Sequence, residues 1–145
     1  MNFKEIIIYE FKNIIEKYNM HLAEISENEI VLYTDKYFLS LMLHSSEVEL
    51  YYYEKQDKII VEYIINSFIA YSISAEDRNT TKNRIKEESN IQLSIALLSQ
   101  TLDEKWSDLL QGGKDWISKY KEFILYIPER DVTEYVVKKY KEVLR

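Results

Sequence analysis

Glu47 and Glu49 are the residues of this chain whose type and spacing come nearest to catalytic chemistry. Two carboxylates serve as the acid and base of glycosidases and hold the metal of many nucleases. On a strand, residues two apart share a face and lie roughly 6–7 Å apart. One hypothesis is therefore an enzyme of unrecognised type that uses Glu47 and Glu49 with a metal. The alternative is a solvated face, which is common in a chain with 30% charged residues.

The other residues that could do chemistry add little to the enzyme hypothesis. His21 and His44 are the only histidines, and neither has a metal-ligand spacing. Ser45 and Ser46 follow His44, but no strand-turn-helix elbow or glycine-rich oxyanion loop accompanies them. The absence of cysteine excludes thiolate metal sites, disulfides and a cysteine nucleophile, and it fits a reducing compartment. We therefore expect no enzyme activity, catalytic residue, metal or cofactor.

The segment from Glu47 to Glu54 favours binding instead, because acidic and apolar residues alternate and three tyrosines follow. A strand here places Glu47, Glu49, Tyr51 and Tyr53 on one face, and Val48, Leu50 and Tyr52 on the face toward the core. Tyrosine is enriched in protein interfaces. The first set is our predicted partner-binding site, complementary to a basic, grooved partner. The alternative is that further helices cover this face as well.

Composition sets limits on the class of protein. A length of 145 residues predicts one domain, residues 1–145. The net charge of -6 and the pI of about 5.1 argue against general nucleic-acid binding. Charged residues interrupt the first 20 residues, so no signal peptide is expected, and no apolar run approaches ~18 residues. We predict a cytoplasmic protein that does not bind nucleic acid or membrane.

The periodicity predicts a helix followed by a small sheet. Residues 2–19 have helical spacing of apolar side chains, with Asn2 as N-cap and Asn19 at the end. Residues 20–54 read as an antiparallel meander of short strands at 22–26, 30–34, 37–44 and 47–53. Residues 58–72 suit either a helix, which we prefer, or a strand.

The second half of the chain predicts further helices. Residues 75–90 form either a loop or an exposed helix start, and residues 87–110 a long helix that ends at Gly112-Gly113. Asp115 is expected to cap a short helix with Ile124 inward, and Pro128 to open a final helix. The buried face of that last helix would be Val132, Tyr135, Val136, Tyr140 and Val143. The expected class is α+β, with the helices packed on one sheet face.

The order of these elements resembles small bacterial immunity proteins of polymorphic toxin and contact-dependent inhibition systems. The likeness lies in the early helix, the meander that includes YFLSLMLHSSEVELYYY, a polar helical stretch, and the break LLQGGKDWI between two helices. The chain differs at His44-Ser45-Ser46, where many such proteins have a hinge with Asp or Arg. The resemblance implies a cytosolic inhibitor that neutralises a cognate toxin by tight binding, and it implies no catalytic residues.

Four functions follow from the sequence as hypotheses. The preferred one is a non-enzymatic, immunity-like protein whose partner is a protein such as a basic toxin domain. The second is a phage or mobile-element accessory protein that inhibits a nucleic-acid enzyme by presenting carboxylates in place of phosphates. The third is the metal-dependent enzyme that uses Glu47 and Glu49. The fourth is a homo-oligomeric structural protein.

Overall fold

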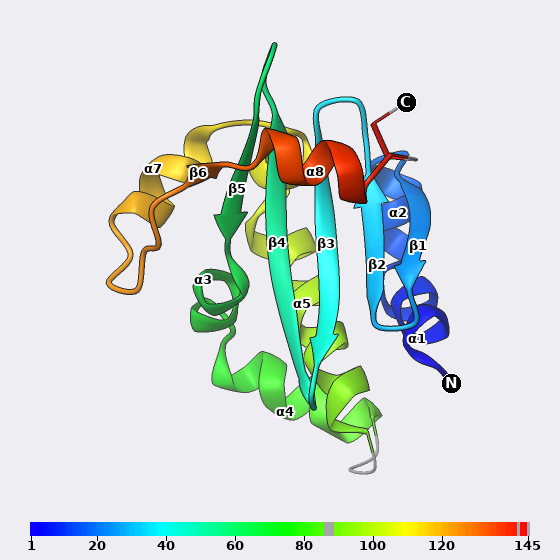
Figure 1. Cartoon of the computed structure of the whole chain (residues 1–145). Helices are drawn as coiled ribbons and strands as arrows, with labels where there is room; N and C mark the ends of the chain where they lie inside the picture. Colours follow the sequence, from blue (N-terminus) through cyan, green and yellow to red (C-terminus); the bar gives the residue numbers. More distant parts are fainter. Residues whose placement is uncertain (86–88, 142, 145) are drawn as a thin grey trace.

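A six-stranded antiparallel sheet in the order β1-β2-β3-β4-β5-β6 is the centre of the fold (Figure 1). It is seen in a computed structural model, which describes residues 1–85, 89–141 and 143–144. The strands are β1 (His21–Ser26), β2 (Glu29–Tyr33), β3 (Tyr37–His44), β4 (Glu47–Lys55), β5 (Ile60–Ile64) and β6 (Arg130–Asp131). The helices are α1 (Phe3–Glu10), α2 (Lys12–Lys17), α3 (Asn66–Tyr71), α4 (Ala75–Arg84), α5 (Asn90–Lys105), α6 (Ser107–Leu110), α7 (Asp115–Lys121) and α8 (Thr133–Lys139).

The first predicted helix is confirmed as the pair α1 and α2. Asn2 caps α1 in a capping box, because its side chain accepts from the Glu5 amide at 2.9 Å and the Glu5 carboxylate accepts from the Asn2 amide. Asn19 ends the segment with a φ of 56°, in the left-handed region that asparagine tolerates. Ile7 of α1, Ile14 of α2 and Phe11 between them are buried in the same core cluster as the sheet residues.

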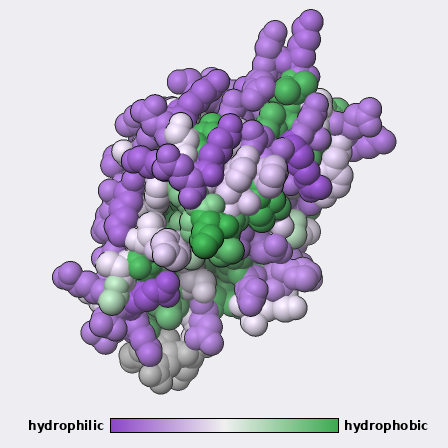
Figure 2. Space-filling view, turned by 90° about the vertical axis from the view of Figure 1, so that its left-hand side faces the viewer, coloured by the Kyte–Doolittle hydropathy of each residue, from purple (hydrophilic) through white to green (hydrophobic). Residues whose placement is uncertain are grey.

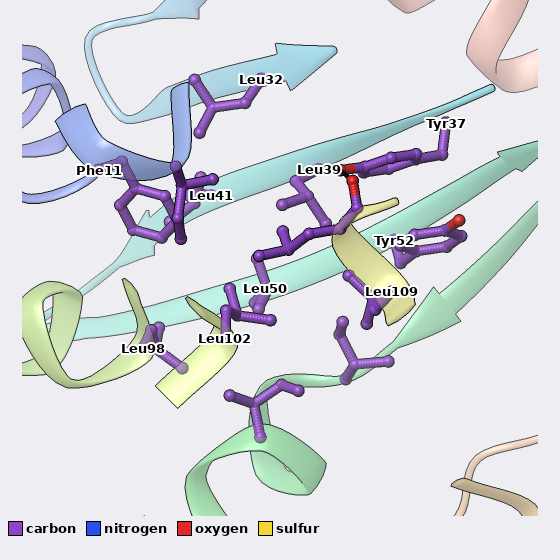
Figure 3. Packing of buried hydrophobic residues seen from close by; sticks show 14 of the residues in the cluster. Phe11, Leu32, Tyr37, Leu39, Leu41, Leu50, Tyr52, Leu98, Leu102 and Leu109 are labelled. Atoms are coloured by element: carbon purple, nitrogen blue, oxygen red, sulfur yellow. Dashed lines mark hydrogen bonds between the residues drawn. The ribbon is translucent and has the colours of Figure 1, made fainter. Parts of the chain in front are cut away.

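The main core lies between the sheet and the helices behind it. Along β3 and β4, Leu39 pairs with Tyr52 and Leu41 with Leu50, and all four side chains are buried. Figure 3 shows Leu50 beside Leu102 of α5 and Tyr52 beside Leu109 of α6, in one buried cluster. The predicted alternation is confirmed, because Val48, Leu50 and Tyr52 of β4 all belong to or contact this core.

The preferred helix at residues 58–72 is wrong for its first half. Residues 60–64 form β5, and only Asn66–Tyr71 is helical. Val61 and Tyr63 join the main core while Ile60 packs on the opposite face, which is the two-residue period of a strand. Pairing with β4 decides the outcome, because β-branched residues fit a strand well once a partner strand is present.

The polar stretch and the long helix that follows it are largely as expected. Ala75–Arg84 is helical, but it is the separate helix α4 rather than the start of the next one, and the predicted helix at 87–110 is α5 followed by the single turn α6. Residues 86–88 lie outside the described part of the chain. Gly112 has a φ of 77° after α6, as a glycine at a helix end requires. Asp115 is the first residue of α7 rather than its cap.

The final helix differs most from the prediction. It begins at Thr133 rather than at Pro128, because Arg130 and Asp131 pair with β5 as a strand and Asp131 then accepts from the Thr133 amide at 2.9 Å. Tyr135 was expected to be buried, but it is 55% exposed. The helix also crosses the sheet face opposite the main core (Figure 1).

The predicted α+β class is nevertheless confirmed, since one helical segment, an antiparallel meander and then further helices follow in order. The meander continues beyond residue 54 through β5, and β6 adds a sixth strand. Among the described residues, no helix combines the length and the hydropathy that crossing a membrane requires.

Truncation of Leu50 to alanine tests which face of β4 belongs to the main core. The Leu50→Ala variant should lose about 2–5 kcal/mol of unfolding free energy, because a buried side chain leaves a cavity. Glu47→Ala on the same strand is the control and should change it by no more than about 0.5 kcal/mol. Urea denaturation measures both, and equal losses would contradict this orientation of β4.

Candidate partner-binding face

The sheet face opposite the main core, here called the outer face, carries all four residues predicted to bind a partner. Glu47, Glu49, Tyr51 and Tyr53 alternate along β4 and pair across to β3 with His44, Met42, Ser40 and Phe38 in turn. Side chains of directly paired residues project to the same side of a sheet. The predicted common face of the four residues is thus present, and the remaining question is which of them solvent can reach.

The C-terminal segment covers one half of the outer face. This C-terminal cover is residues 130–140: β6 pairs with the edge strand β5, and α8 then crosses the upper part of β4 and β3 in Figure 1. Val132, Val136 and Tyr140 pack with Phe38 and Tyr53 in a second apolar cluster. Tyr53 stacks on Phe38 at 4.6 Å between ring centroids and is only 3% exposed. Tyr53 therefore packs beneath the C-terminal cover, where its side chain is not accessible to a partner.

A buried carboxylate at Glu29 holds the end of the C-terminal cover. Glu29 accepts hydrogen bonds from the Ser40 hydroxyl at 2.6 Å and from the Tyr140 hydroxyl at 2.5 Å. The Lys139 ammonium lies 2.9 Å from its other oxygen. A buried charge is tolerated only when it is paired in this way. Burial and the bond to Glu29 raise the pKa of Tyr140 to about 12.

A second buried carboxylate, Glu62, holds the beginning of the C-terminal cover. Glu62 accepts from the Tyr53 hydroxyl at 2.9 Å and from the Arg130 guanidinium at 2.9 Å. Burial raises the pKa of Tyr53 far above its usual range, and the charges nearby add to this effect. The hydroxyl therefore stays protonated and donates to Glu62. Both ends of the C-terminal cover are thus fixed to buried acids of the sheet.

The other half of the outer face is open, and we call it the open half: Met42, His44, Glu47, Glu49 and Tyr51. None of the described helices crosses the lower parts of β3 and β4 in Figure 1. His44 and Glu47 are exposed, whereas Glu49 and Tyr51 are half-buried. The Tyr51 hydroxyl donates to Glu49 at 2.9 Å. Burial and this bond raise the pKa of Tyr51 above its usual range.

A cleft of about 1010 Å³ joins the open half to the C-terminal cover. Tyr51 and Met42 line it from the sheet, and Arg130, Tyr135 and Lys139 line it from the C-terminal cover. A concave site with aromatic walls and a few fixed polar groups is the usual form of a binding site. The outer face is therefore concave beside the C-terminal cover, rather than a flat pair of strands throughout.

The described residues bring no further groups to Glu47 and Glu49 that would complete a metal site. Across the described residues, no three or more His, Asp or Glu side chains come close enough together to hold a metal ion. His44 faces Glu47 across the strand pair. Ser45 forms the tight turn beyond it with a φ of 59°, so its role in this geometry is that of a turn residue.

Sequence reasoning missed the buried acids Glu29 and Glu62 and the cations that reach them. Glu62 has apolar neighbours in the sequence, as Glu24 and Glu49 also have, whereas Glu29 follows the polar turn Ser26-Glu27-Asn28. Their partners lie about 70 and 110 residues further along the chain, so no local pattern could identify them.

A separate apolar surface lies away from the outer face. Figure 2 shows hydrophobic residues gathered amid a largely hydrophilic surface on the side at the left of Figure 1. The link between α7 and β6 lies on that side and includes exposed Ile124, Leu125 and Ile127. Ile124 is 88% exposed, so the prediction that it points inward is wrong, because α7 ends at Lys121.

Removal of the Tyr140 hydroxyl tests how the C-terminal cover is held. Tyr140→Phe should cost about 1.5–3 kcal/mol of unfolding free energy near pH 8, because the lost hydrogen bond has a charged acceptor. The native pKa of Tyr140 is raised to about 12, above its unfolded value of about 10. Its contribution is therefore present below pH ~10 and lost as pH rises through the native value.

Urea denaturation at several pH values between 8 and 12 should show the two chains converging in stability. Tyr9→Phe, at an exposed tyrosine, is the control and should match the wild-type chain throughout. A difference between wild type and Tyr140→Phe that does not depend on pH, or no difference at all, would contradict the assigned contact.

Comparison of the chain with protein-family models, with curated proteins and with solved structures finds no match. The outer face, with its open half, its cleft and its C-terminal cover, is accordingly the basis on which a function is assigned.

Proposed function

We propose that this chain is a non-enzymatic protein-binding protein, immunity-like in its role, which neutralises a cognate bacterial toxin by occluding it. The observation that carries the proposal is the open half of the outer face, where Glu47, Glu49 and Tyr51 stand together beside a cleft. A tyrosine and two carboxylates provide contact area, hydrogen bonds and charge. Because they stand on a rigid strand pair, their side chains lose little conformational entropy when a partner binds.

The rigidity of the open half supports binding of a preformed kind. β3 and β4 pair over eight residues, from Tyr37 opposite Glu54 to His44 opposite Glu47. The main core anchors the same strands from behind through Leu41 and Leu50. Sites built on strands are more precisely positioned than sites on loops. The acidic and aromatic groups are thus presented in a fixed pattern to an incoming partner.

The distribution of charge favours a basic protein partner over mimicry of nucleic-acid phosphates. Glu47 and Glu49 alternate with apolar and aromatic residues, and the cation Lys58 lines the neighbouring cleft beside Asp131 and Glu134. A phosphate mimic needs a continuous array of like charges, as the phosphates of a nucleic acid provide. Mixed charge with aromatic residues is instead typical of a protein–protein interface.

Charge reversal on the open half tests the proposal. Tagged wild-type chain, Glu47→Lys/Glu49→Lys and the control Glu24→Lys/Glu27→Lys would be expressed in the native host, cross-linked, purified and analysed by mass spectrometry. Glu24 and Glu27 are exposed residues elsewhere on the chain. At least one protein should be enriched by the wild type and the control and reduced about tenfold or more by the first variant.

Two results would count against the proposal. One is a set of recovered proteins that is the same for all three chains. The other is the absence of any protein enriched above a tag-only background. Circular dichroism and urea denaturation of each variant show whether it is folded, so a loss of binding can be separated from a loss of structure.

A further inference from the structure

The positive charges of the cleft beside the open half are mostly paired within the protein. Two of the three cations that line it are already paired, because Arg130 lies 2.9 Å from Glu62 and Lys139 lies 2.9 Å from Glu29. Both of these acids are buried beneath the cations. Their positive charge is therefore largely compensated within the protein, and Lys58 is the remaining cation of the lining.

The acids around the same cleft are not compensated in this way. Asp131 and Glu134 line it, and Glu49 is bonded to the lining residue Tyr51. Within the described part of the chain, none of these three carboxylates lies within 4.0 Å of a cationic nitrogen. The cleft and its rim thus have an excess of negative charge, which is complementary to a cation.

The two tyrosines that line the cleft, Tyr51 and Tyr135, indicate which kind of cation fits it. The ring of Tyr51 is stacked on Tyr53, with centroids 6.3 Å apart and an interplanar angle of 29°, so its position is fixed from below. Tyr135 lies on the other side of the cleft, and its ring already faces the ammonium of Lys139 at 5.5 Å. A planar guanidinium can stack on a tyrosine and at the same time give two parallel hydrogen bonds to a carboxylate.

We infer that this cleft binds an arginine side chain of the partner protein, with the guanidinium against the ring of Tyr51 and hydrogen-bonded to Glu49. The inference rests on the proposed function, since it names the anchoring residue of the partner at the same face. The Tyr51 hydroxyl donates to one oxygen of Glu49. This bond orients the carboxylate before the partner arrives, which reduces the entropic cost of binding.

Titration with short peptides tests the inference without knowledge of the partner. Acetyl-Gly-Arg-Gly-amide, acetyl-Gly-Lys-Gly-amide and acetyl-Gly-Glu-Gly-amide would each be added to the isotope-labelled chain and followed by two-dimensional NMR. The arginine peptide should give saturable shifts that cluster at Tyr51, Glu49 and Tyr135, with a Kd of roughly millimolar order as expected for one side chain. The lysine peptide should bind several-fold more weakly, and the glutamate peptide should give no saturable shifts.

Matched variants identify the two groups that are proposed to make the contact. Glu49→Gln and Tyr51→Leu should each weaken binding of the arginine peptide about fivefold or more. Glu27→Gln and Tyr9→Leu change the same residue types at exposed positions outside the cleft, and they should leave its affinity unchanged. The dispersion of each variant's NMR spectrum shows that it remains folded.

Three outcomes would overturn the inference: preference for the glutamate peptide, shifts from the arginine peptide that cluster elsewhere, or the absence of saturable binding. Failure here is distinguishable from failure of the proposed function. If the host protein is captured in a Glu47- and Glu49-dependent manner but the peptide does not bind, only the arginine assignment falls. If the peptide binds as expected but no protein is captured, the arginine site stands and the proposed partner falls.

Discussion

The alternation of side chains along β4 is the constraint on which the rest of the structure depends. Because successive residues of a strand point to opposite faces, placing Leu50 and Tyr52 in the main core fixes the acids and the other tyrosines on the outer face. A register slip of one residue would expose the core side chains to water. The same packing that stabilises the sheet thus presents Glu47, Glu49 and Tyr51 to the outside.

The C-terminal cover divides the outer face into two halves. It is attached to the sheet by ion pairs as well as by apolar contacts. Val136 and Tyr140 bury apolar surface against the sheet. Glu29 and Glu62 determine where the C-terminal cover lies, because a buried carboxylate is stable only when it is paired with a cation. The cost of burying these two acids is offset by hydrogen bonds from Ser40, Tyr53 and Tyr140. Where the cover ends, the cleft and the open half begin.

The sequence was sufficient to predict the elements whose apolar residues have one clear period. It was insufficient where the residues suited both a helix and a strand, or where a helix could pack on either face of the sheet. The β3–β4 pair could be predicted because acidic and apolar residues alternate at the start of β4 and β3 is a short apolar run before a turn, and α5 because its apolar stripe is long. β5 could not, since Val61, Ile64 and Ile65 have helical spacing, while their β-branched side chains suit a strand equally well. The stripe of α8 indicates a buried side but not which sheet face it meets. In the candidate site, the face of β4 to which each side chain points was predictable. The burial of Tyr53 was not, because it depends on Val132, Val136 and Tyr140, which lie far along the chain.

The central claim is that the open half of the outer face meets a protein partner, and cross-linking from a defined position tests it most directly. A photo-reactive amino acid in place of Glu49 would be compared in the native host with the same group in place of Glu104, an exposed residue of α5 behind the sheet. The account predicts a covalent protein adduct from position 49 and none from position 104. Adducts from position 104 alone, or from neither position, would contradict it.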